Sequence, residues 1–258
     1  MTSLIWNSAN DTAALQENSK IEPDLAFIPS LRTAVSILQL VMTVTNSVLL
    51  PLAASNVTVH REMEKSINMM VSRIEDKIGT VQTRTVDVAL NWASKLLARQ
   101  NRNDYRPRDD VNGTEQLQTS TCSSIFTFLT KVREISSTTV EGKNLEPFFN
   151  ELAMGFRTLL LDHFKKFQVN LAGGLMVSKD ITKYIELLRT FHLSPSFLPS
   201  LEVLVELGNI FVIGPEALKD RLRGGSALTG IDKADLRPYI LRRDDANSVG
   251  VQSVLNAL

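Results

Sequence analysis

Residues Asn144–Phe167, NLEPFFNELAMGFRTLLLDHFKKF, decide the fold class of this chain. Large apolar residues and one histidine recur there every three or four positions, the spacing of one face of an α-helix. They are Phe149, Leu152, Phe156, Leu159 or Leu160, His163 and Phe167. Two runs with the same spacing follow, beginning at Ile181 and Leu198. Three successive helices with an apolar face predict an all-α core.

Proline and glycine mark where these helices are expected to begin and end. Ser194-Pro195 and Gly214-Pro215 place a proline at a first helical position, where its missing N–H costs little because that donor would be unpaired anyway. Gly173-Gly174 is expected to stop a helix, since glycine reaches the left-handed conformation without strain.

Apolar spacing predicts further helices at about 29–50, 56–99, 115–137 and 215–222. Gly79 is the one weak point of the second of these, and a charged linker at about 101–113 follows it. No segment has the sustained two-residue alternation of β-strands. We predict a weakly ordered N-terminal segment at 1–28, a helical-bundle domain at 29–240 and a C-terminal tail at 241–258.

One segment has the composition of a membrane span. From Thr33 to Val59 no residue is charged, and VSILQLVMTVTNSVLLPLAA is long enough to cross a bilayer. Its polar residues share one helix face, which favours a helix buried in a bundle over a transmembrane span; they are Ser36, Gln39, Thr43 and Asn46-Ser47. Pro51 is expected to kink or end this helix.

Composition indicates no catalytic chemistry. Lys plus Arg and Asp plus Glu number 28 each, so no bulk charge favours nucleic acid or an acidic membrane. The three histidines lack Cys or carboxylate neighbours at ligand spacing, so no metal, cofactor or enzymatic activity is expected. His163 is interpreted as a packed, hydrogen-bonded core histidine. Arg237, Arg242 and Arg243 beside Asp244-Asp245 are interpreted as a solvated surface.

Several segments resemble the C-terminal region of the exocyst subunit family Sec-ten, also called exocyst complex component five. They are ELAMGFRTLLLDHFKKF at Glu151–Phe167, Gly173-Gly174, DITKYIELLRTF at Asp180–Phe191 and LEVLVELGNIFVIGPEALK at Leu201–Lys219. The resemblance extends back through EGKN at Glu141–Asn144 and DYRPRDD at Asp104–Asp110 to HREMEKSINMMVSRIEDKIG at His60–Gly79. Family members are several hundred residues longer, with an N-terminal coiled-coil part, so this chain is expected to be a fragment or a shortened version.

The resemblance implies an elongated stack of antiparallel helical bundles, the tethering-complex (CATCHR-like) architecture. It implies a non-enzymatic scaffold of the exocyst, which tethers secretory vesicles to the plasma membrane during exocytosis. Such a scaffold is expected to be cytoplasmic and peripheral at plasma-membrane sites, with other exocyst subunits, particularly Sec-fifteen, as partners. The alternatives are a recyclin-like endosomal trafficking protein and a module that binds a small GTPase or an anionic lipid.

The best-matched segment also carries a candidate partner surface. Leu201, Leu204 and Phe211 fall on one helix face and are predicted to be core. Glu202, Glu206 and Asn209 fall largely on another face, where they are predicted either to contact a partner subunit or to be solvated.

Overall fold

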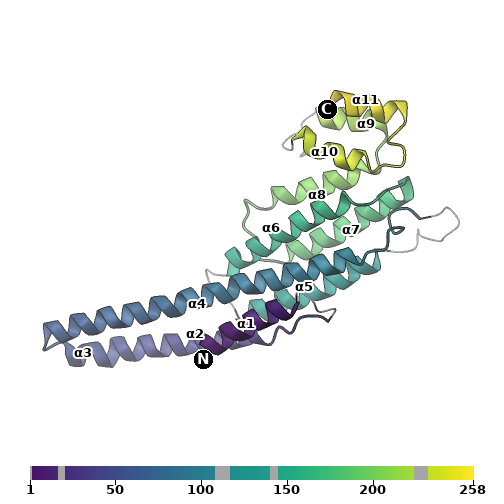
Figure 1. Cartoon of the computed structure of the whole chain (residues 1–258). Helices are drawn as coiled ribbons and strands as arrows, with labels where there is room; N and C mark the ends of the chain where they lie inside the picture. The colour runs from purple at the N-terminus through teal and green to yellow at the C-terminus, as the bar shows by residue number, and fades with distance from the viewer. Residues whose placement is uncertain (1, 17–20, 108–116, 140–144, 224–231) are drawn as a thin grey trace. The chain divides into compact units, whose positions relative to one another are not determined.

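The computed structural model describes residues 2–16, 21–107, 117–139, 145–223 and 232–258 (Figure 1). Within these ranges the chain consists of helices joined by turns, and its extended pairing is limited to one isolated bridge, Val169 with Arg243. This confirms the all-α fold predicted from apolar spacing. The described residues form two compact units, Met1–Trp92 with Lys131–Phe148, and Ala93–Thr130 with Phe149–Leu258.

The first unit contains the N-terminal helices. They are α1 (Thr2–Gln16), α2 (Phe27–Val44), the π-helical turn η1 (Thr45–Leu49), α3 (Leu50–Ala53) and α4 (Val57–Ala98), which belongs to this unit as far as Trp92. α2, η1 and α3 form one continuous rod, and α4 returns beside it (Figure 1). Phe27, Ile28 and Leu31 are buried at the start of α2, where α1 packs against it.

Pro51 neither ends nor sharply interrupts this rod, contrary to the expectation of a kink or an end. Proline has no N–H to donate to the carbonyl four residues earlier. The chain widens into a π-turn just before it, in which the Leu50 N–H donates to the Thr45 carbonyl. A single π-turn of this kind absorbs a local mismatch in hydrogen bonding, so the helix continues to Ala53.

α4 is one unbroken helix of 42 residues, about 63 Å long at 1.5 Å per residue. Asn56 begins it, because the Asn56 side chain accepts a hydrogen bond from the Val59 N–H at 3.2 Å. Gly79 lies within the helix, exposed and with open space around its Cα, and causes no break. The weak point that the sequence indicated is therefore tolerated.

Burial of the uncharged segment was predicted wrongly. Only 11% of its most apolar window is buried, although Phe27–Ala53 is long and apolar enough to cross a membrane by length and composition alone. Leu38 and Thr45 are the last buried side chains along it, and Leu40 and Leu52 are 64% and 75% exposed. α1 packs on the start of α2 and α4 lies beside the rod, and the apolar positions that neither helix covers face outward.

The second unit is built from the C-terminal helices. They are α5 (Ser120–Thr139), which belongs to this unit as far as Thr130, α6 (Leu145–Phe164), which belongs to it from Phe149, α7 (Leu171–Arg189), α8 (Pro199–Ile210), α9 (Pro215–Arg223), α10 (Lys233–Ile240) and α11 (Val249–Ala257). α7 packs on α8, and α11 packs on α9 and α10. The core is aromatic, with Phe156 and Tyr184 in edge contact at 5.3 Å between ring centres.

Gly173-Gly174 does not stop a helix, which corrects the expectation. Both glycines lie in the first turn of α7, which Asn170 begins by accepting from the Gly173 N–H at 2.8 Å. A Cβ on Gly173 would lie 1.6 Å from the Tyr105 carbonyl oxygen, and one on Gly174 would lie 2.6 Å from that of Phe211. The pair is needed because two other backbone segments pass directly against α7.

Several predicted boundaries differ from the observed ones. Ser194-Pro195 opens a turn, and α8 begins at Pro199, whereas Gly214-Pro215 begins α9 as predicted. The linker at 101–113 is described as far as Pro107, and the rest of it lies outside the described residues. Thr2–Gln16 is helical and α11 packs within the second unit, so contacts group the chain differently from the three predicted domains, which stay a prediction.

Candidate partner surface

Helix α8 places its two predicted faces in different environments. Leu201, Leu204 and Leu207 are at most 3% exposed on the side that packs against α7. Phe211, just after the helix, is also buried. Gly208 lies close to Ile181 and Ser178 of α7, so the two helices approach closely there. The prediction that this face is core is confirmed.

The three candidate surface residues do not share one environment. Glu202 is exposed, while Glu206 and Asn209 are half-buried. The Glu206 carboxylate accepts two hydrogen bonds from Nη1 of Arg221 in α9, at 2.6 and 2.7 Å. Glu206 is therefore held within the unit, and the sequence carried no signal for this pairing because Arg221 lies fifteen residues away across a turn.

The outward face of α8 is apolar as well as acidic. Leu198 is 47% and Val205 46% exposed, and they flank Glu202 at helical spacing. The sequence analysis did not identify these two residues as exposed, because apolar residues in a helix with an apolar face are expected to be buried. An exposed Leu–Glu–Val face suits contact with another protein surface better than chemistry.

A buried polar cluster is the described feature that most resembles a chemical site. The Asp180 carboxylate in α7 accepts hydrogen bonds from the Tyr105 hydroxyl at 2.8 Å, the Thr119 N–H at 2.8 Å and the Thr119 hydroxyl at 2.7 Å. Cys122 Sγ lies 3.8 Å from the Asp180 carbonyl oxygen. Tyr105 lies in the linker and Thr119 lies beyond it, so Asp180 holds both residues against α7.

Burial makes this cluster unsuited to catalysis. Desolvation raises the pKa of Asp180, although the hydrogen bonds from Thr119 and Tyr105 oppose the shift. Desolvation and the nearby Asp180 raise the pKa of Cys122, so the sulfur stays a thiol, the weakly nucleophilic form. Tyr105, Cys122 and Asp180 are all fully buried, which leaves a substrate no access.

His163 is a core histidine, as predicted. It is 2% exposed, and its Nε2 donates to the Gln100 side-chain oxygen at 2.8 Å. Its ring packs 4.7 Å from the ring of Phe167. Desolvation, assisted by the positive charge of Lys166, lowers its pKa to about 4, so the imidazole is neutral at pH 7.

Arg243 is not solvated, which corrects the expectation for the Arg237–Arg243 group. Its side chain is 7% exposed and donates from Nη1 to the carbonyl of Ile210 and, at 2.7 Å, to that of Ile213. Asp245 accepts from its other nitrogens at 2.7 and 2.8 Å. Arg243 thus satisfies carbonyls at the C-terminal end of α8, where a helix leaves acceptors unpaired.

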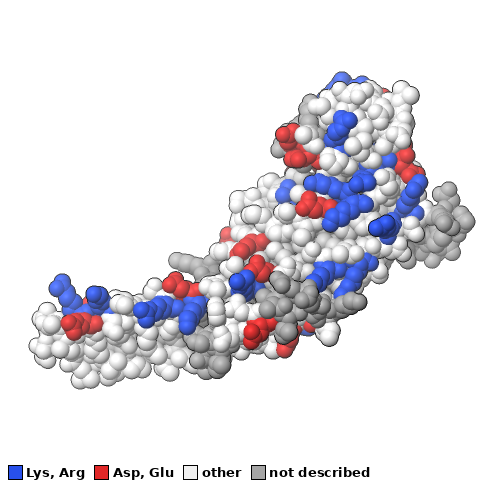
Figure 2. All heavy atoms as spheres, in the orientation of Figure 1, with Lys and Arg blue, Asp and Glu red and all other residues white. Residues whose placement is uncertain are grey.

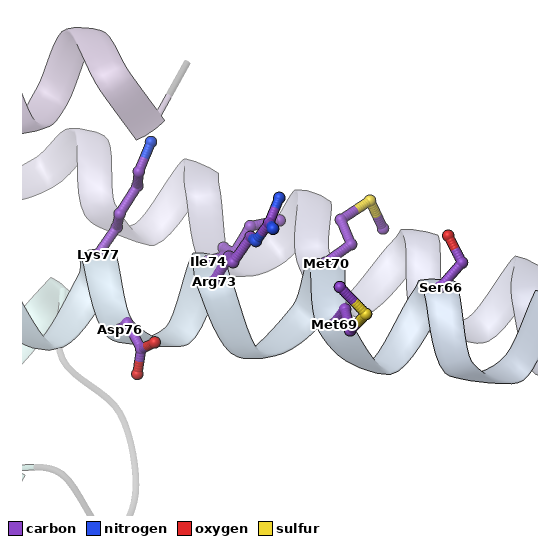
Figure 3. Close-up of a pocket in the computed structure, with 7 residues that line it drawn as sticks. All are labelled: Ser66, Met69, Met70, Arg73, Ile74, Asp76 and Lys77. Carbon is purple, nitrogen blue, oxygen red and sulfur yellow. The ribbon is translucent and has the colours of Figure 1, made fainter.

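The rest of the described surface offers no concentrated chemistry. A shallow hollow of about 530 Å³ runs along α4 (Figure 3), and its lining residues are Ser66, Met69, Met70, Arg73, Ile74, Asp76 and Lys77. Basic and acidic side chains are interspersed on the face drawn in Figure 2. Among the described residues, no three His, Cys, Asp or Glu side chains gather as metal ligands.

One family model matches this chain of helices packed around an apolar core over nearly its whole length. The family model described as "Exocyst complex component Sec10-like, alpha-helical bundle" matches residues 6–255. The chain belongs to this Sec10-like exocyst family. The resemblance inferred from the sequence motifs is thereby confirmed.

Curated relatives carry the corresponding names. Exocyst complex component 5 of Oryza sativa subsp. japonica is 28% identical over 253 residues, 97% of this chain and 30% of the relative. Exocyst complex component SEC10 of Saccharomyces cerevisiae is 28% identical over 226 residues, 87% and 25% of the two chains. Human exocyst complex component 5 is 25% identical over 237 residues, 92% and 33%. The chain therefore spans about a third or less of these relatives.

Proposed function

We propose that this chain is a non-enzymatic scaffold subunit of an exocyst complex, which tethers secretory vesicles to the plasma membrane during exocytosis. The observation that carries the proposal is the match of the Sec10-like helical-bundle family to residues 6–255. The structure is compatible with it, because the described polar clusters are buried structural groups and the exposed face of α8 has protein-contact chemistry. The protein acts from the cytoplasm, peripherally at plasma-membrane sites.

The proposed partners are other exocyst subunits, Sec-fifteen in particular. We place one contact on α8 at Leu198, Glu202 and Val205, with Asn209 at its edge. Glu206 contributes indirectly, since its pairing with Arg221 holds α9 beside α8. An apolar pair flanking one carboxylate fits an apolar partner face that carries a basic residue.

Co-purification of the tagged full chain with the exocyst tests this contact. The double variant Glu202→Lys with Val205→Asp is expected to lower recovery of Sec-fifteen at least several-fold and to leave the melting temperature nearly unchanged, since exposed changes usually shift stability by about 0.5 kcal/mol or less. Glu151→Lys makes the same charge reversal at an exposed position of α6 and is expected to change neither quantity. Undiminished recovery with the double variant would place the contact elsewhere.

Leu204→Ala separates folding from binding in the same assay. Leu204 is fully buried, so its truncation is expected to lower the free energy of unfolding by about 2–5 kcal/mol. Chemical denaturation of purified protein measures that loss. Equal stability of Leu204→Ala and the parent chain would contradict the packing of α8 on α7.

A module for a small GTPase or an anionic lipid is the alternative class. Flotation with vesicles of neutral lipid, with and without acidic lipid, distinguishes it from pure scaffolding. Because basic and acidic residues balance at 28 each, we expect no acid-lipid-dependent flotation. Flotation that requires acidic lipid would favour the alternative.

A further inference from the structure

A groove between α2 and α4 continues beyond the place where α1 ends. α1 packs on the start of α2, and its Ile5 and Ala9 are buried there. Figure 3 shows Lys77 of α4 pointing toward the end of α1, and a hollow of about 530 Å³ runs on from Lys77 along α4 to Ser66. Within the described residues, a third helix therefore fills the start of this groove and leaves the rest of it open.

The α2 wall of the groove is apolar. Four β-branched residues recur along it at steps of four, three and four, so they share one flank of the rod. They are Ile37, Val41, Val44 and Val48. Each is between 36% and 48% exposed, and all four lie beyond the start of α2 that α1 covers.

The α4 wall combines methionine with positive charge. Its residues recur at the same steps of four, three and four; they are Ser66, Met70, Arg73 and Lys77. Figure 3 shows Met70, Arg73 and Lys77 pointing to one side of the helix and Asp76 pointing to the other. Methionine is flexible and polarisable, which suits a surface that adapts to a binding partner.

The two walls lie on the same side of the hairpin. α2 and α4 run antiparallel, and the line along which they meet is marked by the buried Leu38 and Thr45 of α2 and Val71 of α4. At 100° per residue, each wall precedes that line in the same rotational sense in its own helix, and antiparallel neighbours place such flanks together. The opposite side of the hairpin is mainly polar; its residues include Gln39, Asn46, Glu64, Asn68 and Glu75.

Two positive charges on the α4 wall await a counter-charge. Within the described part of the chain, Arg73 and Lys77 make no ion pair. They lie one turn apart on the same flank, so they repel each other and both favour a carboxylate placed across the groove. The α2 wall cannot supply it, because no charge occurs between Thr33 and Val59.

We propose that this groove binds an amphipathic α-helix of another protein chain, with an apolar face and acidic residues along one edge. α1 shows that a helix fits the groove, and the open part continues the same seat. A helix that docks in this way places apolar residues of one face into the groove. Here that face meets Met70 and the α2 wall, and the acidic edge meets Arg73 and Lys77. From Lys77 to Val59 the open groove is about 27 Å long, which takes a helix of about 18 residues.

Fluorescence anisotropy of labelled peptides with the full chain tests the proposal. One peptide of about 18 residues has Leu at helical spacing and Glu along one edge, and its twin has Lys in place of every Glu. The Glu peptide is expected to bind the parent chain at least about tenfold more tightly at low salt, because only it complements Arg73 and Lys77. Added salt is expected to reduce this difference.

Charge reversal in the groove is the decisive variant. Arg73→Glu with Lys77→Glu is expected to reverse the preference, so that the Lys peptide binds more tightly. Arg61→Glu with Lys65→Glu makes the same double reversal at the same spacing elsewhere on the exposed surface of α4, and it is expected to keep the preference of the parent.

A single variant tests the apolar part of the groove. Met70→Asp is expected to weaken binding of the Glu peptide at least about tenfold, since it places a charge against the apolar face of the peptide. Asn68→Asp adds the same charge on the polar side of the hairpin and is expected to keep most of the binding. All of these positions are exposed, so circular dichroism and the melting temperature are expected to stay close to those of the parent.

Several outcomes would overturn the proposal. Two are seen with the parent chain: neither peptide binds, or both bind with equal affinity. Another is a reversed preference in the variant with Arg61→Glu and Lys65→Glu. A dimer in sedimentation velocity that Met70→Asp abolishes would assign the groove to a second copy of the chain. Neutral vesicles that float the chain and displace the Glu peptide would assign it to lipid.

Discussion

Single buried polar residues hold the second unit together in places that apolar periodicity does not mark. Asp180 accepts three hydrogen bonds from Tyr105 and Thr119, and His163 donates to Gln100. In each case a helix residue ties down a residue near the linker. Loss of one partner would leave a buried donor unsatisfied, which costs more than the net gain from the bond.

The pH dependence of stability is expected to reveal His163. Its pKa falls from 6.5 to about 4 on folding, so between these values the unfolded chain binds a proton that the native chain does not. The contribution of His163 to the free energy of unfolding is fully present above pH 6.5 and is lost as the pH falls toward 4. The total loss is about 3 kcal/mol. Urea unfolding of the parent and of His163→Gln, which keeps a donor without titrating, measures it. Parallel pH profiles would contradict the assignment.

Asp180 should show the opposite sign of pH dependence. Desolvation raises the pKa of Asp180 in the folded chain above 3.8. At pH values between 3.8 and the folded pKa, the native carboxyl therefore holds a proton that the unfolded chain has released. Its stabilising contribution is therefore present below pH 3.8 and is lost as pH rises through the folded pKa. This titration occurs equally in the parent and in His163→Gln and cancels in their difference.

Substitution of Asp180 compares two degrees of loss. Asp180→Ala removes every acceptor and is expected to cost about 2–4 kcal/mol, since three buried donors lose their partner. Asp180→Asn keeps one oxygen acceptor and is expected to cost less. Denaturant midpoints at pH 7 give both values, and an Ala variant as stable as the parent would show that water replaces the carboxylate.

At the scale of the element, the same residue type plays opposite roles in two helices. Gly79 lies in the middle of α4 with nothing within 4 Å of an added Cβ, so it only weakens the helix. Gly173 lies in the first turn of α7, where the Tyr105 backbone occupies the place of a Cβ. Helical propensity governs the first position and tertiary contact governs the second.

Alanine at the two glycines should therefore act in opposite directions. Gly79→Ala is expected to raise the free energy of unfolding by about 0.5–1 kcal/mol. Gly173→Ala must displace the linker backbone at Tyr105. It is therefore expected to lower the free energy of unfolding by about 1–3 kcal/mol or more, as overpacking typically does. Thermal unfolding of the two variants side by side decides the matter, and stabilisation by both would refute the close approach.

At the scale of the whole molecule, burial is uneven along the chain. Leu152, Phe156, Tyr184 and Leu188 of the second unit are fully buried, whereas most side chains from Leu40 to Met70 are exposed. Local stability follows the density of buried apolar contacts. The end of the α2–α4 hairpin where the chain turns, around residues 45–60, is therefore expected to have a lower local stability than the core of the second unit.

Hydrogen exchange should map this difference. Amides of residues 45–60 are expected to exchange faster than those of 150–160 and 176–188 by at least about a hundredfold at low protein concentration. Hydrogen exchange is read by mass spectrometry of peptides from the two regions. Uniform protection along the chain would contradict the uneven packing.

The sequence by itself determined the all-α fold, the family and most helix positions, because these follow from local periodicity and from the order of many weak motifs. It also identified His163 and the apolar face of α8 correctly. Tertiary structure alone decided the roles of Gly173, Arg243 and Glu206, since each depends on a segment that is distant in sequence and near in space. Exposure of the large apolar residues between Ile37 and Leu52 was also decided there, because the apolar composition of a helix does not show which of its positions a neighbouring helix covers.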